Sequence, residues 1–254
     1  MTIRSDHPSL DVRIAAACRV HNHLRNGKDH FPADREASAV LEAQVPGIRQ
    51  LIDHARYFMH CRVRSSAGRG IAQYVDLGCG TPLYPHGCSD SVHDTASAWL
   101  DGRQPHTLYV DNDPMALAHA RALLTTDTAE VVAADLRDPA FLPQLKARLD
   151  TRPVAAFLIN VLEHLDDEDG ARLLNLLADG LPAGSTLSLA TLVGPDPAAY
   201  MITKAMTKAA PSLGWRLRTP ATLTELLPTG LPWSVVTDRS DDIRNLTATL
   251  TVPR

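Results

Sequence analysis

The sequence predicts an α/β fold, in which helices cover a doubly wound and mostly parallel sheet. Short apolar runs of strand length alternate with helical segments between residues 74 and 209, as is typical of a parallel sheet. The run 154–159 is apolar at every position, as expected of a central strand buried on both faces. Two strands then follow one another near the end of the chain, which predicts that the final strand inserts antiparallel.

Length and composition fit one large domain with additions. The chain has 254 residues, of which 44% are hydrophobic and 21% are charged. A formal net charge of -4 and scattered arginines give no reason to expect a nucleic-acid partner. There is no apolar run of membrane-spanning length and no apolar leader segment, so we expect a cytoplasmic protein without a membrane partner. The cysteines lack the spacing of a zinc site or a disulfide framework, so we expect free thiols at Cys18, Cys61, Cys79 and Cys88.

The first 70 residues are predicted to be helical. Apolar residues at three- and four-residue intervals predict helices over 9–24, 34–44 and 46–64, followed by a linker over 65–70. Residues 21–36 are rich in turn formers and ionisable groups, and Pro32 prevents a continuous helix. We expect this loop to cover a ligand, with a solvated connection as the alternative. The predicted organisation is an N-terminal helical lid, residues 1–70, ahead of a ligand-binding domain, residues 71–254.

The strand at 74–77 runs into a loop that contains Gly78 and Gly80. Glycines take positive φ angles and let a ligand approach the backbone amides closely. A dinucleotide site would have a third glycine three residues after Gly80, where this chain has Leu83. Asp76, just before the glycines, would repel a pyrophosphate and attract a cationic ligand. S-adenosylmethionine, with its sulfonium and α-amino groups, is such a ligand, and the missing glycine makes a nicotinamide-dependent reductase the weaker alternative.

The strand at 107–111 ends in Asp111, followed by Asn112. A carboxylate at the end of the second strand of a doubly wound sheet can accept both ribose hydroxyls of a nucleoside. Asp111 follows Asp76 by 35 residues, more than the roughly twenty expected, and an insertion after Tyr84 explains the excess. Asp113 is expected to cap the next helix, which covers 115–124.

The strand at 130–136 closes on Asp135 and Leu136. The Asp135 carboxylate is placed to accept from an adenine amino group, with the Leu136 amide opposite a ring nitrogen, and a helix-cap role is the alternative for Asp135. The strand at 154–160 leads to His164. The remaining predicted elements are helices over 141–149, 170–179, 197–209 and 219–227 and strands over 185–192, 234–237 and 245–252.

Taken together, the strand-end motifs resemble those of the class I S-adenosylmethionine-dependent methyltransferases. The motifs stand in the order of that class at residues 75–80, 110–111, 134–136 and 160–164. More narrowly, the chain resembles the actinobacterial S-adenosyl methyltransferase family DUF574 over nearly its whole length, through residues 27–36, 109–114 and 118–124. The resemblance implies a Rossmann-like, seven-stranded sheet. It also implies an enzyme that transfers a methyl group from S-adenosylmethionine to a small-molecule acceptor in secondary metabolism.

The class pattern also implies roles for individual residues. The methionine end of the cofactor is expected to contact Asp76, Gly78 and Gly80, and the sulfonium region is expected to contact Asn160. Asp111 with Asn112 is expected to bind the ribose, and Asp135 with Leu136 the adenine. Arg56 is a candidate partner of the cofactor carboxylate, since arginine forks suit carboxylates, and a surface arginine is the alternative. The chain departs from the DUF574 pattern at His21, His23, Asn26, His30 and Cys79, so the resemblance assigns no acceptor.

Two histidines are candidates for a catalytic base. His164 follows the fourth strand and would be largely neutral at cellular pH, and His30 in the lid is the second candidate, with a structural role open for both. We expect no metal site, because a short histidine-rich loop is more often solvated. Other functions stay open: a cyclisation or rearrangement promoted by the sulfonium charge without methyl transfer, or a cofactor-binding module that signals to a partner. A homodimer is also left open.

Overall fold

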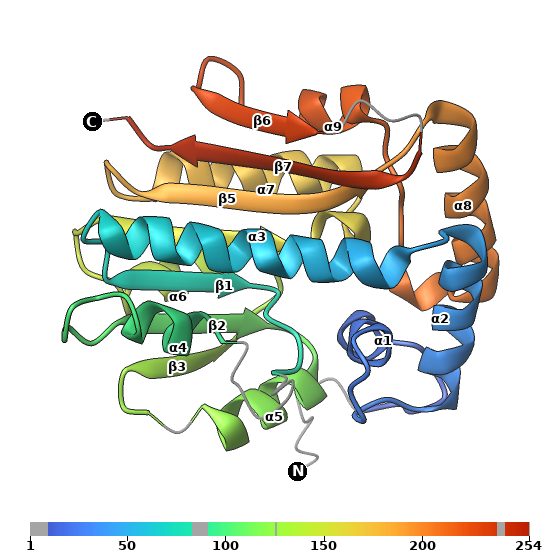
Figure 1. Cartoon of the computed structure of the whole chain (residues 1–254), viewed down its shortest axis with the longest axis horizontal. Coiled ribbons are helices and arrows are strands. Elements are labelled where there is room, and N and C mark those ends of the chain that lie inside the picture. Colours follow the sequence, from blue (N-terminus) through green and yellow to red (C-terminus); the bar gives the residue numbers. More distant parts are fainter. Residues whose placement is uncertain (1–9, 83–90, 125, 238–241, 254) are drawn as a thin grey trace, which may run out of the picture.

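The computed structural model describes residues 10–82, 91–124, 126–237 and 242–253 (Figure 1). In these ranges, seven strands form one sheet in the order β3-β2-β1-β4-β5-β7-β6. Neighbouring strands from β3 to β5 are parallel, and β7 pairs antiparallel with both β5 and β6. The predicted doubly wound, mostly parallel sheet with an antiparallel late strand is therefore confirmed. The strands are β1 Gln73–Leu77, β2 His106–Asp111, β3 Ala129–Ala133, β4 Val154–Ile159, β5 Thr186–Val193, β6 Trp233–Thr237 and β7 Arg244–Thr251.

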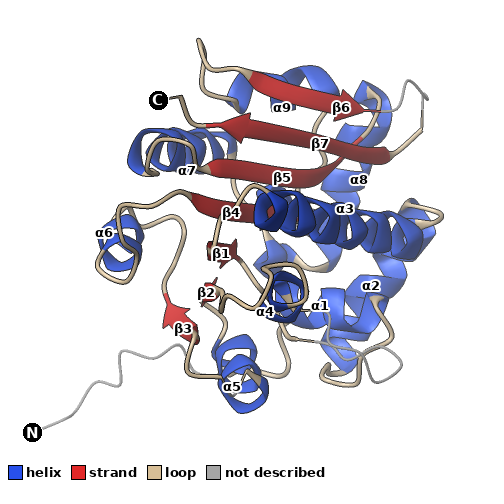
Figure 2. Ribbon diagram, turned by 60° about the vertical axis from the view of Figure 1, so that its left-hand side comes forward, coloured by secondary structure: helices blue, strands red, loops and turns tan. Residues whose placement is uncertain are grey.

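Helices cover both faces of the sheet (Figure 2). One face packs against α3 (Ile48–Gly68), α4 (Val92–Ser97) and α5 (Pro114–Leu123), which share an apolar cluster with Tyr74, Tyr109 and Phe157. The other face packs against α6 (Phe141–Lys146), α7 (Asp167–Gly180) and α9 (Pro220–Leu226), and Val75, Leu77 and Leu158 belong to this second cluster. Successive residues of β1 thus point to opposite faces, and both faces are apolar, as in a central parallel strand.

A third apolar cluster lies beyond the carboxyl ends of the parallel strands. It joins α1 (Ala17–Leu24), α2 (Pro32–Gln44) and the first turns of α3 to α8 (Asp196–Ala209). Figure 1 shows α1, α2 and α8 together at this end of the sheet. The N-terminal helices therefore lie where ligands of doubly wound sheets bind. The proposed boundary between lid and domain at residue 70 stays a prediction.

Local sequence signals explain several helix starts. The Asp113 carboxylate accepts from the backbone N–H groups of Met115 and Ala116 at 2.8 and 3.1 Å, and Pro114 occupies the first helical position of α5. The predicted cap is thus confirmed. Asp166 caps α7 in the same way by accepting from Asp169 N.

Three predicted boundaries are wrong. The first helix begins at Ala17, because the backbone between Asp11 and Ala16 hydrogen-bonds to the side chains of Arg19 and Asp34 and not to a helical ladder. The predicted linker at 65–70 is helical as far as Gly68, because α3 continues along the sheet. β3 ends at Ala133, so Asp135 and Leu136 lie in the turn that follows.

Cys18, Cys61 and Cys79 are free thiols, as predicted, and Cys88 lies outside the described residues. Residues 84–90, where the predicted insertion begins, also lie outside them. Over the described ranges, the chain forms no helix of the length and apolarity needed to cross a bilayer.

Candidate functional site

A cavity of about 430 Å³ lies at the carboxyl ends of β1, β2, β3 and β4. Its size is that of a small-molecule site. The strand ends form one wall, and α1 with the segment before it forms the opposite wall through residues 14–18, His21, Asn22 and Arg25. Of the residues predicted from the sequence, the cavity brings together Arg56, Gly78, Gly80, Asp111, Asn112, Asp135, Leu136, Asn160 and His164.

The glycine loop has the geometry that only glycine accommodates well. Gly78 and Gly80 have φ angles of 72° and 64°. A Cβ atom on Gly78 would lie 2.6 Å from Cγ2 of Val161, closer than atoms can approach without displacing the neighbour. The Gly78 amide donates to Val110 O at 2.8 Å, which ties the loop to β2.

Asp111 lies at the point where the glycine loop and β2 meet. Its Oδ2 accepts from Gly80 N and its Oδ1 from Asp113 N, both at 2.9 Å. Burial raises the pKa of Asp111 to about 6, against the lowering effect of these backbone hydrogen bonds. Each carboxylate oxygen has a second lone pair, so Asp111 retains acceptor capacity for donors in the cavity.

Asp135 is held by a neighbour that sequence reasoning did not identify. Arg137 Nε donates to Asp135 Oδ1 at 2.9 Å and Arg137 Nη2 to Oδ2 at 2.6 Å, and this pairing lowers the pKa of Asp135. The Arg137 backbone N–H also donates to Oδ1, which makes a tight turn. Asp135 is not the cap of α6, whose N-cap residue is Ala140. An arginine two residues after the aspartate was the available sequence signal.

Asn160 is a buried amide with unmet hydrogen-bonding capacity. It directly follows β4 with a φ of 54°, and neither Nδ2 nor Oδ1 has a hydrogen-bond partner among the described residues. Burying such a group without a partner is costly, and strain of this kind is concentrated at functional sites. Asn160 lines the cavity, so its amide is available to a ligand there.

Two predicted residues lie outside the cavity wall. Asp76 is 2% exposed and does not line the cavity. His30 also does not line it: its Nδ1 is 3.3 Å from Arg35 Nη1, and its ring packs edge-on to His23 with the centroids 4.6 Å apart. Of the histidines in the predicted lid, the one that lines the cavity is His21, on α1.

His21 and His164 form a pair across the cavity wall. Their ring centroids are 5.8 Å apart with an angle of 69° between the planes. Burial lowers the pKa of His164, and burial together with the neighbouring His164, Arg25 and Arg56 lowers the pKa of His21 to about 3. Both imidazoles are therefore neutral at pH 7.

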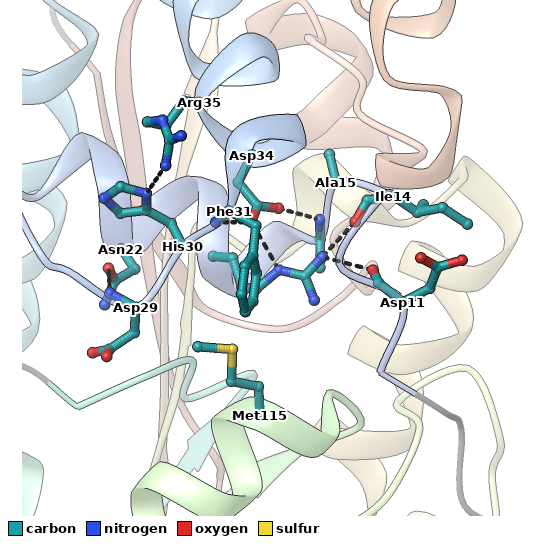
Figure 3. Close-up of polar contacts among 12 residues, drawn as sticks. Asp11, Ile14, Ala15, Asn22, Asp29, His30, Phe31, Asp34, Arg35 and Met115 are labelled. Atoms are coloured by element: carbon teal, nitrogen blue, oxygen red, sulfur yellow. Dashed lines mark hydrogen bonds and ion pairs between the residues drawn. The ribbon is translucent and has the colours of Figure 1, made fainter.

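A buried ion pair holds α1 and the preceding segment against the cavity (Figure 3). Asp34 Oδ2 accepts from Arg19 Nε at 2.9 Å and from Phe31 N at 2.8 Å, and its Oδ1 accepts from Ala16 N at 3.0 Å. Arg19 also donates to the carbonyls of Asp11 and Ile14, and the two side chains are only 3% and 0% exposed. We call Arg19 and Asp34 the N-terminal clasp. No pattern in the sequence indicates that Arg19 is buried.

A second contact ties α1 to the glycine loop. Asn22 Nδ2 donates to Thr81 Oγ1 at 3.0 Å, and Asn22 Oδ1 accepts from Asp29 N at 2.9 Å. In the described parts of the chain, no group of three or more histidine, cysteine or acidic side chains is arranged to hold a metal ion.

Comparison with known proteins matches residues 4–232 to the family described as S-adenosyl methyltransferase. A solved protein from Thermobifida fusca YX, with a provisional assignment as a methyltransferase, is 26% identical with a TM-score of 0.82, and 100% of each chain is covered. A DUF574 family protein from Streptomyces avermitilis MA-4680 is 28% identical with a TM-score of 0.79, over 96% of this chain and 99% of that one. An O-methyltransferase family protein from Burkholderia thailandensis shares the fold at 15% identity and a TM-score of 0.53, over 87% and 59%. No curated protein matches.

The residues of the cavity fit the cofactor that this family uses. The glycine loop admits close approach to backbone amides, Asp111 retains acceptor capacity, and the Asn160 amide lacks a partner among the described residues. The family match covers most of the chain, and the sheet is the Rossmann-like one that the resemblance implied. The chain belongs to the S-adenosyl methyltransferase family and is an S-adenosylmethionine-dependent methyltransferase.

Proposed function

We propose that the protein methylates a small-molecule acceptor of secondary metabolism, which binds in the cavity beside His164. The observation that supports this proposal is the size of the cavity. The strand ends and α1 face one another across a cavity of about 430 Å³, which has room for small molecules and not for a folded partner.

In this proposal, the residues at each strand end bind a different part of the cofactor. Asp111 and Asn112 bind the ribose, and the turn at Asp135 and Leu136 binds the adenine. The amides of the glycine loop hold the methionine end, with Asp76 below the loop contributing its negative charge. Arg56 pairs with the carboxylate, and Asn160 lies near the sulfonium. These roles are supported by the position of each residue: all but Asp76 line one cavity.

When bound, S-adenosylmethionine supplies a methyl carbon activated by a positively charged sulfur. The protein's contribution is to align the acceptor with that carbon and to exclude water, an effect that can supply roughly 7 to 11 kcal/mol of the barrier. In our proposal His164 accepts the acceptor's proton. His30, outside the cavity lining, is the weaker of the two candidate bases.

Calorimetry with S-adenosylhomocysteine tests the cofactor site directly. We expect one molecule to bind per chain, and we expect Asp111→Ala to abolish or strongly weaken this binding. Asp53→Ala is the matched control, because Asp53 is an exposed carboxylate on α3 outside the cavity. Equal affinity in the wild type and Asp111→Ala would contradict the proposed site. With an accepted substrate, a product of unchanged mass without S-adenosylhomocysteine would show a non-methylating reaction instead.

A further inference from the structure

The part of the cavity around His21 and His164 differs in charge from the part around Asp111 and Asp135. Arg25 and Arg56 line the cavity near His21 and both lower its pKa. Among the described residues, no carboxylate shifts the pKa of His21 or His164. Among the described lining residues, the carboxylates lie at or just after the ends of β2 and β3: Asp111, Asp113 and Asp135. We call the region of His21, His164, Arg25 and Arg56 the histidine end.

The tautomer of His164 follows from its contacts. Its Nδ1 is 2.9 Å from the carbonyl oxygen of Leu213. A carbonyl only accepts, so in the neutral ring Nδ1 carries the hydrogen and donates it to Leu213. Nε2 is then the nitrogen with the free lone pair. It is buried and has no hydrogen-bond partner among the described residues, in a side chain that lines the cavity.

The backbone around His164 is fixed from two further directions. Arg218 donates to the carbonyls of Leu162 and Leu165 at 2.6 and 2.7 Å, on either side of His164. The Glu163 carboxylate accepts from Leu192 N at 2.7 Å, and the Glu163 carbonyl accepts from Arg216 N at 2.7 Å. The position of the free Nε2 is therefore set by the fold before any acceptor binds, as preorganised proton transfer requires.

Charge and basicity at the histidine end restrict the acceptor. An aliphatic amine, with a pKa of about 10 as in lysine, arrives as a cation, and the four residues of the histidine end offer it no carboxylate. A neutral imidazole with a lowered pKa is a weak base, so it removes a proton efficiently only from a fairly acidic hydroxyl. A phenol, with a pKa of about 10 as in tyrosine, meets this condition far better than an aliphatic hydroxyl.

We propose that the histidine end binds a phenolic or enolic hydroxyl and that His164 Nε2 removes its proton, so that the enzyme is an O-methyltransferase. This inference rests on the proposed function. In the step, the hydroxyl proton passes to Nε2 and the oxygen forms a bond to the methyl carbon. The carbon–sulfur bond breaks and its electron pair stays on sulfur, which gives S-adenosylhomocysteine and a methyl ether. The imidazolium then returns its proton to solvent.

His21 shapes the same subsite without sharing the proton. Its pKa of about 3 keeps it neutral, and its ring packs edge-on against His164. It therefore adds no positive charge beside the base, and its position on α1 places it opposite the 3₁₀ turn Leu162–His164. We assign His21 as a positioning residue that limits how the acceptor approaches Nε2.

Three probes of nearly equal size test the proposal: 4-ethylphenol, 4-methylbenzyl alcohol and 4-methylbenzylamine. Each is titrated calorimetrically into the protein saturated with S-adenosylhomocysteine, and each is incubated with S-adenosylmethionine while product is measured. We expect the phenol to bind and to be methylated at oxygen, and the amine to show neither. If substituted phenols as a class fail to bind, or the amine binds as tightly as the phenol, the proposal is overturned.

The His164→Asn variant separates the base from the fold. The asparagine amide can still donate to the Leu213 carbonyl, but it has no group at the position of Nε2. We expect about a 10²- to 10⁴-fold loss of turnover with the phenol and loss of the acid limb of the pH–rate profile, with S-adenosylhomocysteine affinity unchanged. His54→Asn, at an exposed histidine of α3, is the control.

Several outcomes would contradict the role of His164. Wild-type turnover in His164→Asn, or an acid limb that persists in it, excludes His164 as the base. Nitrogen NMR of the wild type gives an independent readout, since we expect protonated Nδ1 and unprotonated Nε2 at pH 7, and the reverse tautomer overturns the assignment. A wild type that binds no S-adenosylhomocysteine would instead contradict the proposed function itself, so the two failures are distinguishable.

Discussion

At the scale of single residues, Asp111 combines burial with unused acceptor capacity. Its carboxylate accepts two backbone N–H groups and lines the cavity. We expect Asp111→Asn to weaken S-adenosylhomocysteine binding about ten- to hundredfold, because hydrogen bonds to a charged partner contribute about 1.5 to 3 kcal/mol. Calorimetry at pH 7.5 measures this loss. Asp53→Asn removes a carboxylate from the exposed face of α3 and should bind like the wild type.

The same residue predicts a pH dependence of cofactor binding. Burial raises the pKa of Asp111 to about 6, so a proton occupies the carboxylate increasingly as the pH falls through 6. The protonated acid is a poorer acceptor for ribose hydroxyls, and the affinity for S-adenosylhomocysteine should therefore decline below pH 6, by up to tenfold per pH unit. In Asp111→Asn this dependence should be absent. A wild-type affinity that is constant between pH 7.5 and 5 would refute the assignment.

Residues that sequence could identify are those whose role is set locally. Gly78 and Gly80 were predictable because positive φ is a local demand, and Asp111 because it ends a strand. The ion pair between Asp135 and Arg137 and the contact between the rings of His21 and His164 were not predictable. Both depend on how separate segments pack, and single-sequence patterns do not encode that packing.

At the scale of elements, the N-terminal clasp fixes one wall of the cavity. Arg19→Met leaves the Asp34 carboxylate buried without its countercharge, and removing one partner of such a pair costs about 3 to 5 kcal/mol. We expect that decrease in the free energy of unfolding, measured by urea denaturation. We also expect weaker S-adenosylhomocysteine binding, since residues 14–17 lose their anchor.

Arg13→Gln provides the matched control for the clasp. Arg13 pairs with Asp11 on the surface with its side chain 86% exposed, and surface ion pairs contribute little to stability. Similar losses in the two variants would mean that the buried pair has no special role. Loss of stability in Arg19→Met without any loss of cofactor affinity would mean that the clasp does not shape the cavity.

The glycine loop gives a second prediction at this scale. Gly78→Ala places a Cβ 2.6 Å from Val161 Cγ2 and forces an alanine to a φ of 72°, which we expect to lower stability by about 1 to 3 kcal/mol. In the double variant with Val161→Ala, the stability lost to the steric overlap should be recovered, whereas the stability lost to the positive φ should not. Gly68→Ala is the control: its Cβ would meet no atom within 4 Å at the end of α3, so we expect unchanged or higher thermal stability. Equal effects at Gly68 and Gly78 would contradict this account.

The order of elements was predictable from the sequence, and their ends were less so. Each strand of the sheet appears within three residues of its predicted bounds, because apolar runs and turn formers mark strands locally. The first helix is shorter than its apolar spacing predicts, since Arg19 and Asp34 take the backbone groups that a longer helix would use. That outcome depends on a contact between α1 and α2.

At the scale of the whole molecule, three apolar clusters hold two helical layers and the N-terminal helices around one sheet. Strand–helix alternation predicts the first two clusters, because both faces of a parallel sheet must be covered. The third cluster joins α1 and α2 to α8, which follows about 150 residues later in the chain. Periodicity cannot reveal that contact, so the position of α1 over the cavity emerges only from the structure.

The stability of the whole molecule also depends on pH, because the fold holds some buried groups in one protonation state. His21 has a pKa of about 3 in the folded protein against an ordinary value of 6.5, so the unfolded chain takes up a proton below pH 6.5 and the folded chain does not. Stability from this residue is complete above pH 6.5 and is lost as the pH falls toward 3, by about 2 kcal/mol at pH 5. Asp111 and Glu163 act oppositely, since burial raises their pKa values.

Because these contributions oppose one another, the total change in the free energy of unfolding between pH 7 and 5 does not report on any one group. Comparing that change between the wild type and a His21 variant isolates the contribution of the histidine. We expect His21→Phe to remove about 2 kcal/mol of the acid destabilisation, measured as the free energy of unfolding in urea at both pH values. His54→Phe changes an exposed histidine and should leave the pH dependence as in the wild type. If His21→Phe and the wild type lose the same stability on acidification, His21 is not held neutral by the fold, and the uncharged pair at the histidine end is refuted.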